Sequence, residues 1–216
     1  MDTTVRSVQP SRHAAQVLPL VQCCMADFAV KPSRALGARL PNFTLRNVVT
    51  GKQDTLYSQA EPKATVVVFL SAVCPCSQGY DARMAALAQE YRQRGVRFVG
   101  INAGEGETVA AAAEHATRSD LSFPVLKDPK QVVMARLGAR MTPEVYVADS
   151  LGIVRYHGRI DDNRDAAQVR RHDLQEALDG LLSGKRPERA DVTPFGCAIP
   201  RVVENPPPVP GSTASL

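Results

Sequence analysis

Hydrophobic residues gather in two short continuous runs near the middle of the chain. The first, residues 64–71, reads Ala-Thr-Val-Val-Val-Phe-Leu-Ser, and the second, residues 96–102, reads Val-Arg-Phe-Val-Gly-Ile-Asn. Runs of this length that are rich in β-branched side chains are typical of strands covered on both faces. Between them, residues 77–94 place apolar and small side chains at helical spacing. The pattern therefore predicts a strand, a helix and a second strand parallel to the first.

Shorter elements follow toward the C-terminus. Helices are expected over residues 107–118, 131–137 and 172–182, and a short strand over residues 123–126. Two more strands, residues 144–148 and 153–157, are predicted to form a hairpin around the turn Asp149-Ser-Leu-Gly152. Strands that alternate with helices and end in a hairpin and a helix indicate an α/β layer fold. The first strands should be parallel and the last two antiparallel.

The predicted elements lie in one domain of ordinary size, residues 37–184. Residues 1–36 show no clear periodicity and are interpreted as a leader. Residues 185–216 form a C-terminal extension that is proline-rich near its end, and its last residues are predicted to be an extended tail.

The leader has some features of a weak signal peptide. Arg6 and Arg12 precede a mostly apolar stretch at residues 14–25, but Pro19 interrupts that stretch and Asp2 lies where a basic residue is expected. Two locations therefore stay open: a bacterial-type cytoplasm, or the periplasm or exterior if the leader is a signal.

Composition excludes several classes of protein. The 26 basic and 22 acidic residues are scattered and leave a net charge of only +4, which argues against a nucleic-acid partner. The chain has no Trp and 5% aromatic residues, so a platform for stacking bases is not expected. No apolar run reaches the roughly 18 residues of a membrane-spanning helix. With 44% hydrophobic residues, the chain can bury a core.

The candidate chemistry centres on Cys74-Pro75-Cys76-Ser77, which begins three residues after the first hydrophobic run. Proline suits the first turn of a helix, because its missing N–H would be unpaired there. Free backbone N–H groups and the helix dipole at that point favour a thiolate on Cys74. The thiolate is the form of cysteine that attacks disulfides and peroxides. Two inert core cysteines are the plainer alternative.

Four segments together resemble a thioredoxin-fold redoxin of the alkyl hydroperoxide reductase and thiol-specific antioxidant family. They are Pro41-Asn-Phe-Thr-Leu45, residues 65–77, Met141-Thr-Pro-Glu144 and residues 149–158. The resemblance implies a thioredoxin-like α/β fold, with a central mixed sheet flanked by helices. It also implies that Cys74 is the nucleophile, and that the Thr142–Pro143 bond is cis and lies beside Cys74.

The sequence departs from both main patterns of this group. Ser77 takes the place of the second cysteine of a Cys-x-x-Cys dithiol. In the peroxidase pattern, Ser71 stands for the threonine that binds thiolate and peroxide, and Arg155 matches the arginine that lowers the thiolate pKa. Val67, however, replaces the proline of that pattern. The substrate class, hydroperoxide or protein disulfide, stays open.

Three thiols are candidates to resolve an oxidised Cys74. Cys76 is nearest, but a disulfide across one intervening residue is strained. Cys197 lies in the C-terminal extension, which could fold back over the site, and we favour it over Cys76. A small external thiol is the third candidate. Alternatively, Cys197 packs as a small hydrophobe.

We therefore predict a thiol-dependent oxidoreductase with no organic cofactor, which takes its electrons from an external thiol and has an undetermined oligomeric state. One competing hypothesis is a copper-binding metallochaperone that holds Cu(I) with Cys74 and Cys76. Another is a redox-inactive adaptor. His157 is interpreted as a half-exposed strand residue and not as a metal ligand, and His115 as a solvated helix residue.

Overall fold

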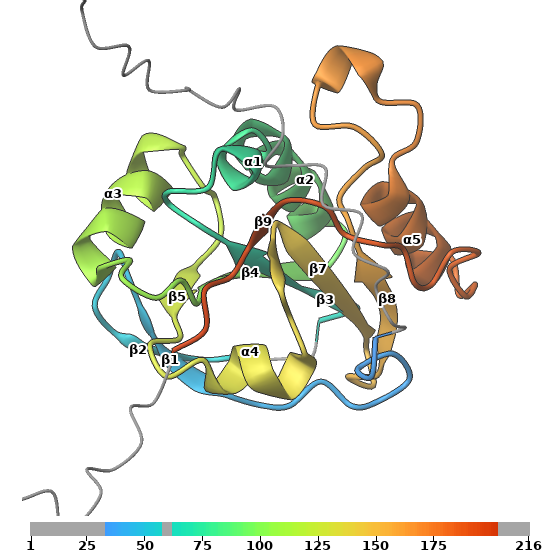
Figure 1. Ribbon diagram of the computed structural model, residues 1–216. Coiled ribbons are helices and arrows are strands. Elements are labelled where there is room, and N and C mark those ends of the chain that lie inside the picture. The colour runs from blue at the N-terminus through green and yellow to red at the C-terminus, as the bar shows by residue number, and fades with distance from the viewer. Residues whose placement is uncertain (1–32, 58–61, 203–216) are drawn as a thin grey trace, which may run out of the picture.

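The computed structural model describes residues 33–57 and 62–202 (Figure 1). Seven strands of this described part form one mixed sheet in the order β2-β1-β5-β4-β3-β7-β8. Their bounds are β1 (Thr44–Asn47), β2 (Gln53–Thr55), β3 (Ala64–Leu70), β4 (Val96–Asn102), β5 (Val125–Lys127), β7 (Glu144–Asp149) and β8 (Val154–Gly158). The thioredoxin-like α/β fold expected from the sequence is confirmed.

The strand directions match the predictions. Strands β3 and β4 are parallel, as are β4 and β5, whereas β7 is antiparallel to both β3 and β8. The tight turn at residues 149–152 joins β7 and β8, with the Gly152 N–H donating to the Asp149 carbonyl. The short strands β1 and β2 were not predicted, because three or four residues are too few to show an alternating pattern.

Helices cover both faces of the sheet (Figure 1). They are α1 (Pro75–Gln78), α2 (Asp81–Gln93), α3 (Val109–Arg118), α4 (Val132–Leu137) and α5 (Asp173–Leu182), with a 3₁₀ turn, η2, at Ala166–Gln168. The single helix expected over residues 77–94 is two helices, with Gly79 and Tyr80 between them.

Alternate residues of β3 enter two separate cores. Val66 and Val68 pack with α2, α3 and α5, and Val67 and Phe69 pack with α4 and the segment that leads into β1. All seven residues of β3 are buried. The uninterrupted hydrophobic run in the sequence follows directly from this two-sided burial.

The sequence analysis ended the folded domain at residue 184. The described chain continues beyond that residue and packs across the domain. Val192 and Ile199 are buried, and Cys197–Ala198 form a short strand, β9, that pairs with β6 (Met141–Thr142). Figure 1 shows this C-terminal segment crossing close to α1 and the start of β7. Residues 1–32 of the leader, which was predicted at residues 1–36, and the proline-rich tail lie outside the described residues, whereas Ala35 is buried in the core. Within the described part, no helix is long and apolar enough to cross a membrane.

Candidate active site

Cys74 lies where β3 gives way to α1, as predicted. It is the N-cap residue of α1, its backbone is extended, and Pro75 begins the helix. The Ser77 N–H donates to Cys74 Sγ over 3.4 Å. Because α1 has only four residues, this single N–H, and not a helix macrodipole, is the main local support for a thiolate.

Ser71 shapes the loop that carries Cys74. Its Oγ accepts the N–H groups of Val73 and Cys74, over 3.2 and 3.0 Å, and donates to Glu107 Oε1 over 2.8 Å. The hydroxyl proton is therefore directed at a carboxylate. The expectation that it would bind the thiolate or a peroxide is not supported by this arrangement, which gives Ser71 a positioning role.

Glu107 is a positioning residue that the sequence analysis missed. Its Oε2 accepts the Ala72 N–H over 2.7 Å and the Asn102 side-chain amide over 2.8 Å. Asn102 is fully buried at the end of β4 and also accepts a hydrogen bond from Lys127. The one available signal was this polar residue at the end of a hydrophobic strand. The 36 residues between Ser71 and Glu107 concealed their contact.

We expect Glu107→Ala to lower the rate of Cys74 disulfide exchange roughly tenfold to a hundredfold, because the loop that aims the sulfur loses its carboxylate anchor. Stopped-flow exchange with oxidised glutathione measures this rate. Glu105→Ala removes an exposed carboxylate from the same loop and is the matched control. Equal rates for the two variants would remove Glu107 from the positioning role.

The loop that holds Pro143 forms another side of the site. The Thr142–Pro143 peptide bond is cis, as the family resemblance implied. Cys74 Sγ lies 3.4 Å from the Thr142 carbonyl oxygen. Cys74 and Pro143, 69 positions apart in the sequence, are therefore neighbours in the fold.

Cys197 reaches the site from the C-terminal segment. Strand β9 pairs with β6 in antiparallel fashion, with Cys197 opposite Thr142. Cys74 and Cys197 form a disulfide across 123 residues, with their Cα atoms 6.1 Å apart. The sulfur atoms of Cys74, Cys76 and Cys197 all lie within 4.8 Å of one another. Both sequence candidates for a second protein thiol are thus at the site, and the disulfide joins Cys197.

Gly196 lets β9 approach the loop before Pro143. A Cβ atom at this position would overlap the Thr142 carbonyl oxygen. We expect Gly196→Ala to shift the Cys74–Cys197 equilibrium toward the dithiol roughly tenfold in a glutathione buffer, because β9 must move outward. Gly180→Ala in α5, where the nearest atom is 3.9 Å from the added Cβ, should leave the equilibrium unchanged. If Gly196→Ala also leaves the equilibrium unchanged, β9 accommodates the added methyl group without weakening the disulfide.

Arg155 lies away from the cysteines. Its Nε donates to Asp149 Oδ2 over 2.6 Å, at the hairpin end of β7, whereas the Thr142–Pro143 loop precedes the other end of that strand. Strand β7 has six residues, and at about 3.3 Å per residue its two ends are roughly 17 Å apart. The structure therefore does not bring Arg155 to Cys74, and its expected effect on the thiolate has no geometric support.

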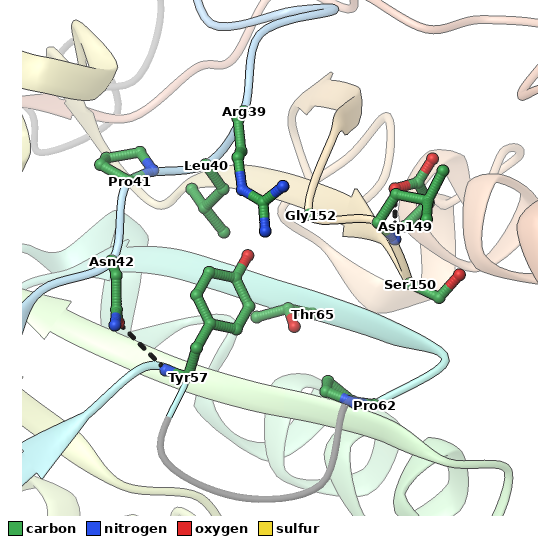
Figure 2. A pocket seen from close by; sticks show the side chains of 11 residues that line it. Arg39, Leu40, Pro41, Asn42, Tyr57, Pro62, Thr65, Asp149, Ser150 and Gly152 are labelled. Atoms are coloured by element: carbon green, nitrogen blue, oxygen red, sulfur yellow. Dashed lines mark hydrogen bonds between the residues drawn. The ribbon is translucent and has the colours of Figure 1, made fainter.

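The hairpin end also holds a cavity of about 360 Å³ (Figure 2). Arg39, Tyr57, Thr65, Asp149 and Gly152 are among the residues that line it. Thr65 belongs to the start of β3, and Cys74 follows the end of that strand. The cavity is therefore remote from the redox chemistry and does not belong to the candidate active site.

His157 is buried, contrary to the prediction of a half-exposed residue. Only 2% of it is exposed, and its ring nitrogens contact Glu144 Oε1 over 2.8 Å and Asp191 Oδ1 over 2.7 Å. Burial by itself lowers the pKa of His157, but the hydrogen bonds to the two carboxylates outweigh it and the pKa is raised. The ring therefore bridges β7 and the C-terminal segment through its contacts with the two carboxylates.

Glu144 extends this bridge to the active-site loop. Its Oε2 accepts the backbone N–H groups of Arg140 and Met141, just before Thr142. Burial would raise the pKa of Glu144, but the hydrogen bonds from His157 and the backbone lower it. The chain Asp191–His157–Glu144 thus ties the Cys197 segment to the Pro143 loop.

Among the described residues, one group of side chains has the spacing to hold a metal ion: the sulfurs of Cys74, Cys76 and Cys197. Three soft thiolates suit Cu(I), but Cys74 and Cys197 form a disulfide, so such binding would need the reduced protein. His157 is not part of the group. His115, predicted to be solvated, is 1% exposed and contacts Asp81 over 2.7 Å, so that expectation was wrong.

Comparison with known proteins agrees with this geometry. The profile of the AhpC/TSA family matches residues 36–157, more than half of the chain. The chain belongs to the AhpC/TSA family. The thiol-disulfide oxidoreductase ResA of Halalkalibacterium halodurans is 28% identical over 131 residues, which cover 60% of this chain and 72% of the relative. Family and cysteine pair together define this redoxin as a thiol-dependent oxidoreductase.

Two solved structures of uncharacterised proteins resemble most of the chain. An uncharacterised conserved protein from Geobacillus kaustophilus is 28% identical, with a TM-score of 0.74 over 82% of this chain and 97% of the other. A hypothetical protein from Sinorhizobium meliloti is 29% identical, with a TM-score of 0.74 over 81% of this chain and all of the other. The peroxidoxin BcpB from Mycobacterium tuberculosis, 21% identical with a TM-score of 0.56 over 70% of this chain and 98% of the other, shares the fold.

Proposed function

We propose that this redoxin is a thiol–disulfide oxidoreductase whose working pair is Cys74 and Cys197. The disulfide between these two residues, beside the cis Pro143 loop, is the observation that carries the proposal. Cys74 follows a buried strand and Cys197 comes from the C-terminal segment, so two rigidly held segments present the sulfurs to each other.

The reaction then has two exchange steps. The Cys74 thiolate attacks one sulfur of a substrate disulfide, forms a mixed disulfide and releases the first substrate thiolate. The Cys197 thiolate next attacks Cys74 Sγ, closes the internal disulfide and releases the second substrate thiolate. The substrate gains two electrons, and the protein loses the same two. An external thiol reductant reverses the oxidation of the protein.

The surroundings of Cys74 support a disulfide over a hydroperoxide as the substrate. A peroxidase site of the expected kind needs a hydroxyl and a guanidinium close to the sulfur. Here the Ser71 hydroxyl donates to Glu107, and Arg155 pairs with Asp149 at the far end of β7. The similarity to a thiol-disulfide oxidoreductase points in the same direction.

Parallel stopped-flow reactions test the proposal. The reduced protein is mixed either with oxidised glutathione or with hydrogen peroxide, and free cysteine is the reference thiol for both. We expect at least about tenfold acceleration over cysteine with the disulfide, with formation of the Cys74–Cys197 disulfide, and little acceleration with peroxide. Acceleration confined to peroxide would establish a peroxidase instead. If neither oxidant reacts faster with the protein than with free cysteine, both the disulfide oxidoreductase and the peroxidase hypotheses are overturned.

A further inference from the structure

We infer that the reduced protein binds a soft monovalent metal ion, Cu(I), through the Sγ atoms of Cys74, Cys76 and Cys197. The three sulfurs lie within 4.8 Å of one another, which is close enough for one ion to contact all of them. The inference goes beyond the proposed function, whose two exchange steps use Cys74 and Cys197 and need no metal. It gives a chemical role to Cys76, which those steps do not use.

Two segments bring the sulfurs together. Cys74 is the N-cap of α1 and Cys76 lies in the first turn of that helix, so one short segment supplies two of them. Cys197 comes from β9, where it lies opposite Thr142 of β6. Cys74 and Cys76 are 4% and 1% exposed, and Cys197 is partly exposed. An ion from solvent therefore reaches the group from the side of Cys197.

Contacts other than the disulfide hold the Cys197 segment against the domain. Ile199 is buried, and its N–H donates to the Arg140 carbonyl over 2.8 Å. The Gln131 side chain donates to the Pro200 carbonyl over 2.6 Å. These hydrogen bonds do not depend on the disulfide, so we expect the third thiol to stay at the site after reduction. Ligands that are already in place lose less conformational freedom when an ion binds.

The ligand set favours Cu(I) over other common ions. Thiolates are soft ligands, suited to Cu(I), zinc and iron–sulfur clusters. A structural zinc site takes four protein ligands in a tetrahedron, whereas this group, among the residues that the structure describes, has three and includes no imidazole or carboxylate. Cu(I) accepts trigonal coordination by thiolates alone. The Ser77 N–H, which donates to Cys74 Sγ over 3.4 Å, favours the thiolate form that a metal requires.

Metal binding and disulfide formation exclude each other. Each thiol that becomes a ligand releases its proton to solvent, so one Cu(I) displaces as many as three protons from the group, and no electron is transferred. The Cys74–Cys197 disulfide consumes thiols that the ion needs. The site therefore exists only in the reduced protein.

Titration of the reduced full-length protein with Cu(I) tests the inference. Cys23 and Cys24 lie outside the described residues and are replaced by serine in the parent protein, which keeps the three cysteines of the group. Cu(I) is supplied without oxygen as its coloured bicinchoninate complex, and loss of the colour reports transfer. We expect transfer of about one Cu(I) per chain to the reduced parent and none to the oxidised parent. Absence of transfer to the reduced parent would overturn the inference.

Single serine variants of this parent distinguish a three-sulfur site from a pair of thiols. Cys74→Ser, Cys76→Ser and Cys197→Ser should each weaken Cu(I) binding at least about a hundredfold, since loss of a residue that only supports a ligand already costs roughly tenfold to hundredfold. Val73→Ser changes an exposed neighbour of Cys74 and should leave the affinity unchanged. All variants are compared in the reduced state, so the disulfide contributes to none of them. Equal affinities for Cys76→Ser and the parent would overturn the three-sulfur site.

X-ray absorption at the copper edge gives a readout that does not depend on affinity. We expect about three sulfur neighbours around Cu(I) in the parent. A shell of only two sulfurs would contradict the inference. Disulfide exchange takes part in neither experiment. Slow exchange with normal Cu(I) transfer would therefore overturn the proposed function alone, and rapid exchange without Cu(I) transfer would overturn the metal site alone.

Discussion

Replacing Cys74 by serine is expected to abolish disulfide exchange, with a rate at least about a thousandfold lower than that of the wild type. Serine keeps the shape of the N-cap and can still accept the Ser77 N–H, but its hydroxyl does not ionise near neutral pH and cannot attack a disulfide. Cys197→Ser should fail differently. Cys74 still completes the first attack, releases one thiolate, and then stays in a mixed disulfide with the substrate.

Intact-protein mass spectrometry and stopped-flow thiol release distinguish these two failures. Cys197→Ser should show one equivalent of released thiol and a stable adduct, and Cys74→Ser should show neither. Thermal unfolding by circular dichroism controls for loss of the fold, since both variants also lack the disulfide. If the mixed-disulfide adduct still forms in Cys74→Ser, another cysteine is the nucleophile. Complete turnover by Cys197→Ser would make a different thiol the resolving group.

The second large effect is expected from Glu144→Ala, which should lower the free energy of unfolding by about 3–5 kcal/mol. Glu144 is 2% exposed and accepts hydrogen bonds from two backbone N–H groups, from Tyr146 and from His157. Its removal leaves the buried imidazole of His157 with one carboxylate partner fewer. The backbone N–H groups of Arg140, partly buried, and Met141, buried, also lose their acceptor, and an unsatisfied buried donor is costly.

Denaturant unfolding with a matched surface variant measures this loss. Arg118→Ala breaks an exposed ion pair with Glu114 in α3 and should change the free energy of unfolding by no more than about 0.5 kcal/mol. Equal free energies for Glu144→Ala and Arg118→Ala would show that the buried network contributes no net stability.

The effect of Glu144 should also depend on pH. The raised pKa of His157 means that its contribution is fully present below its ordinary pKa of 6.5 and is lost as pH rises through the raised value. The lowered pKa of Glu144 means that its contribution is present above 4.5 and is lost as pH falls through the lowered value. The difference in stability between wild type and Glu144→Ala should therefore be largest between about pH 4.5 and 6.5. A stability difference that grows steadily above that pH range would contradict this role of the Asp191–His157–Glu144 network.

Local sequence patterns were sufficient for most of the sheet and for the position of Cys74, the proposed nucleophile. The runs that became β3 and β4 could be recognised because both faces of each strand are largely buried, which leaves a nearly continuous hydrophobic pattern. The β7–β8 hairpin could be recognised because the residues that form its turn are adjacent in the sequence. Cys74 was placed correctly because a strand end, a cysteine and a proline adjoin in the sequence, and Pro75 does begin a helix.

Tertiary structure decided which side chains share the site. Glu107 reaches Ser71, and Cys197 reaches Cys74, through contacts between segments 36 and 123 residues apart, a separation at which no local pattern operates. Arg155 had the right spacing for a peroxidase arginine, but the hairpin turns it toward Asp149. His157 looked like an ordinary strand residue until the C-terminal segment covered it and supplied Asp191. The sequence by itself thus determined the scaffold and the place of the Cys74 sulfur, because those depend on neighbouring residues. The partners of that sulfur depend on how distant segments pack, and only the folded chain shows that.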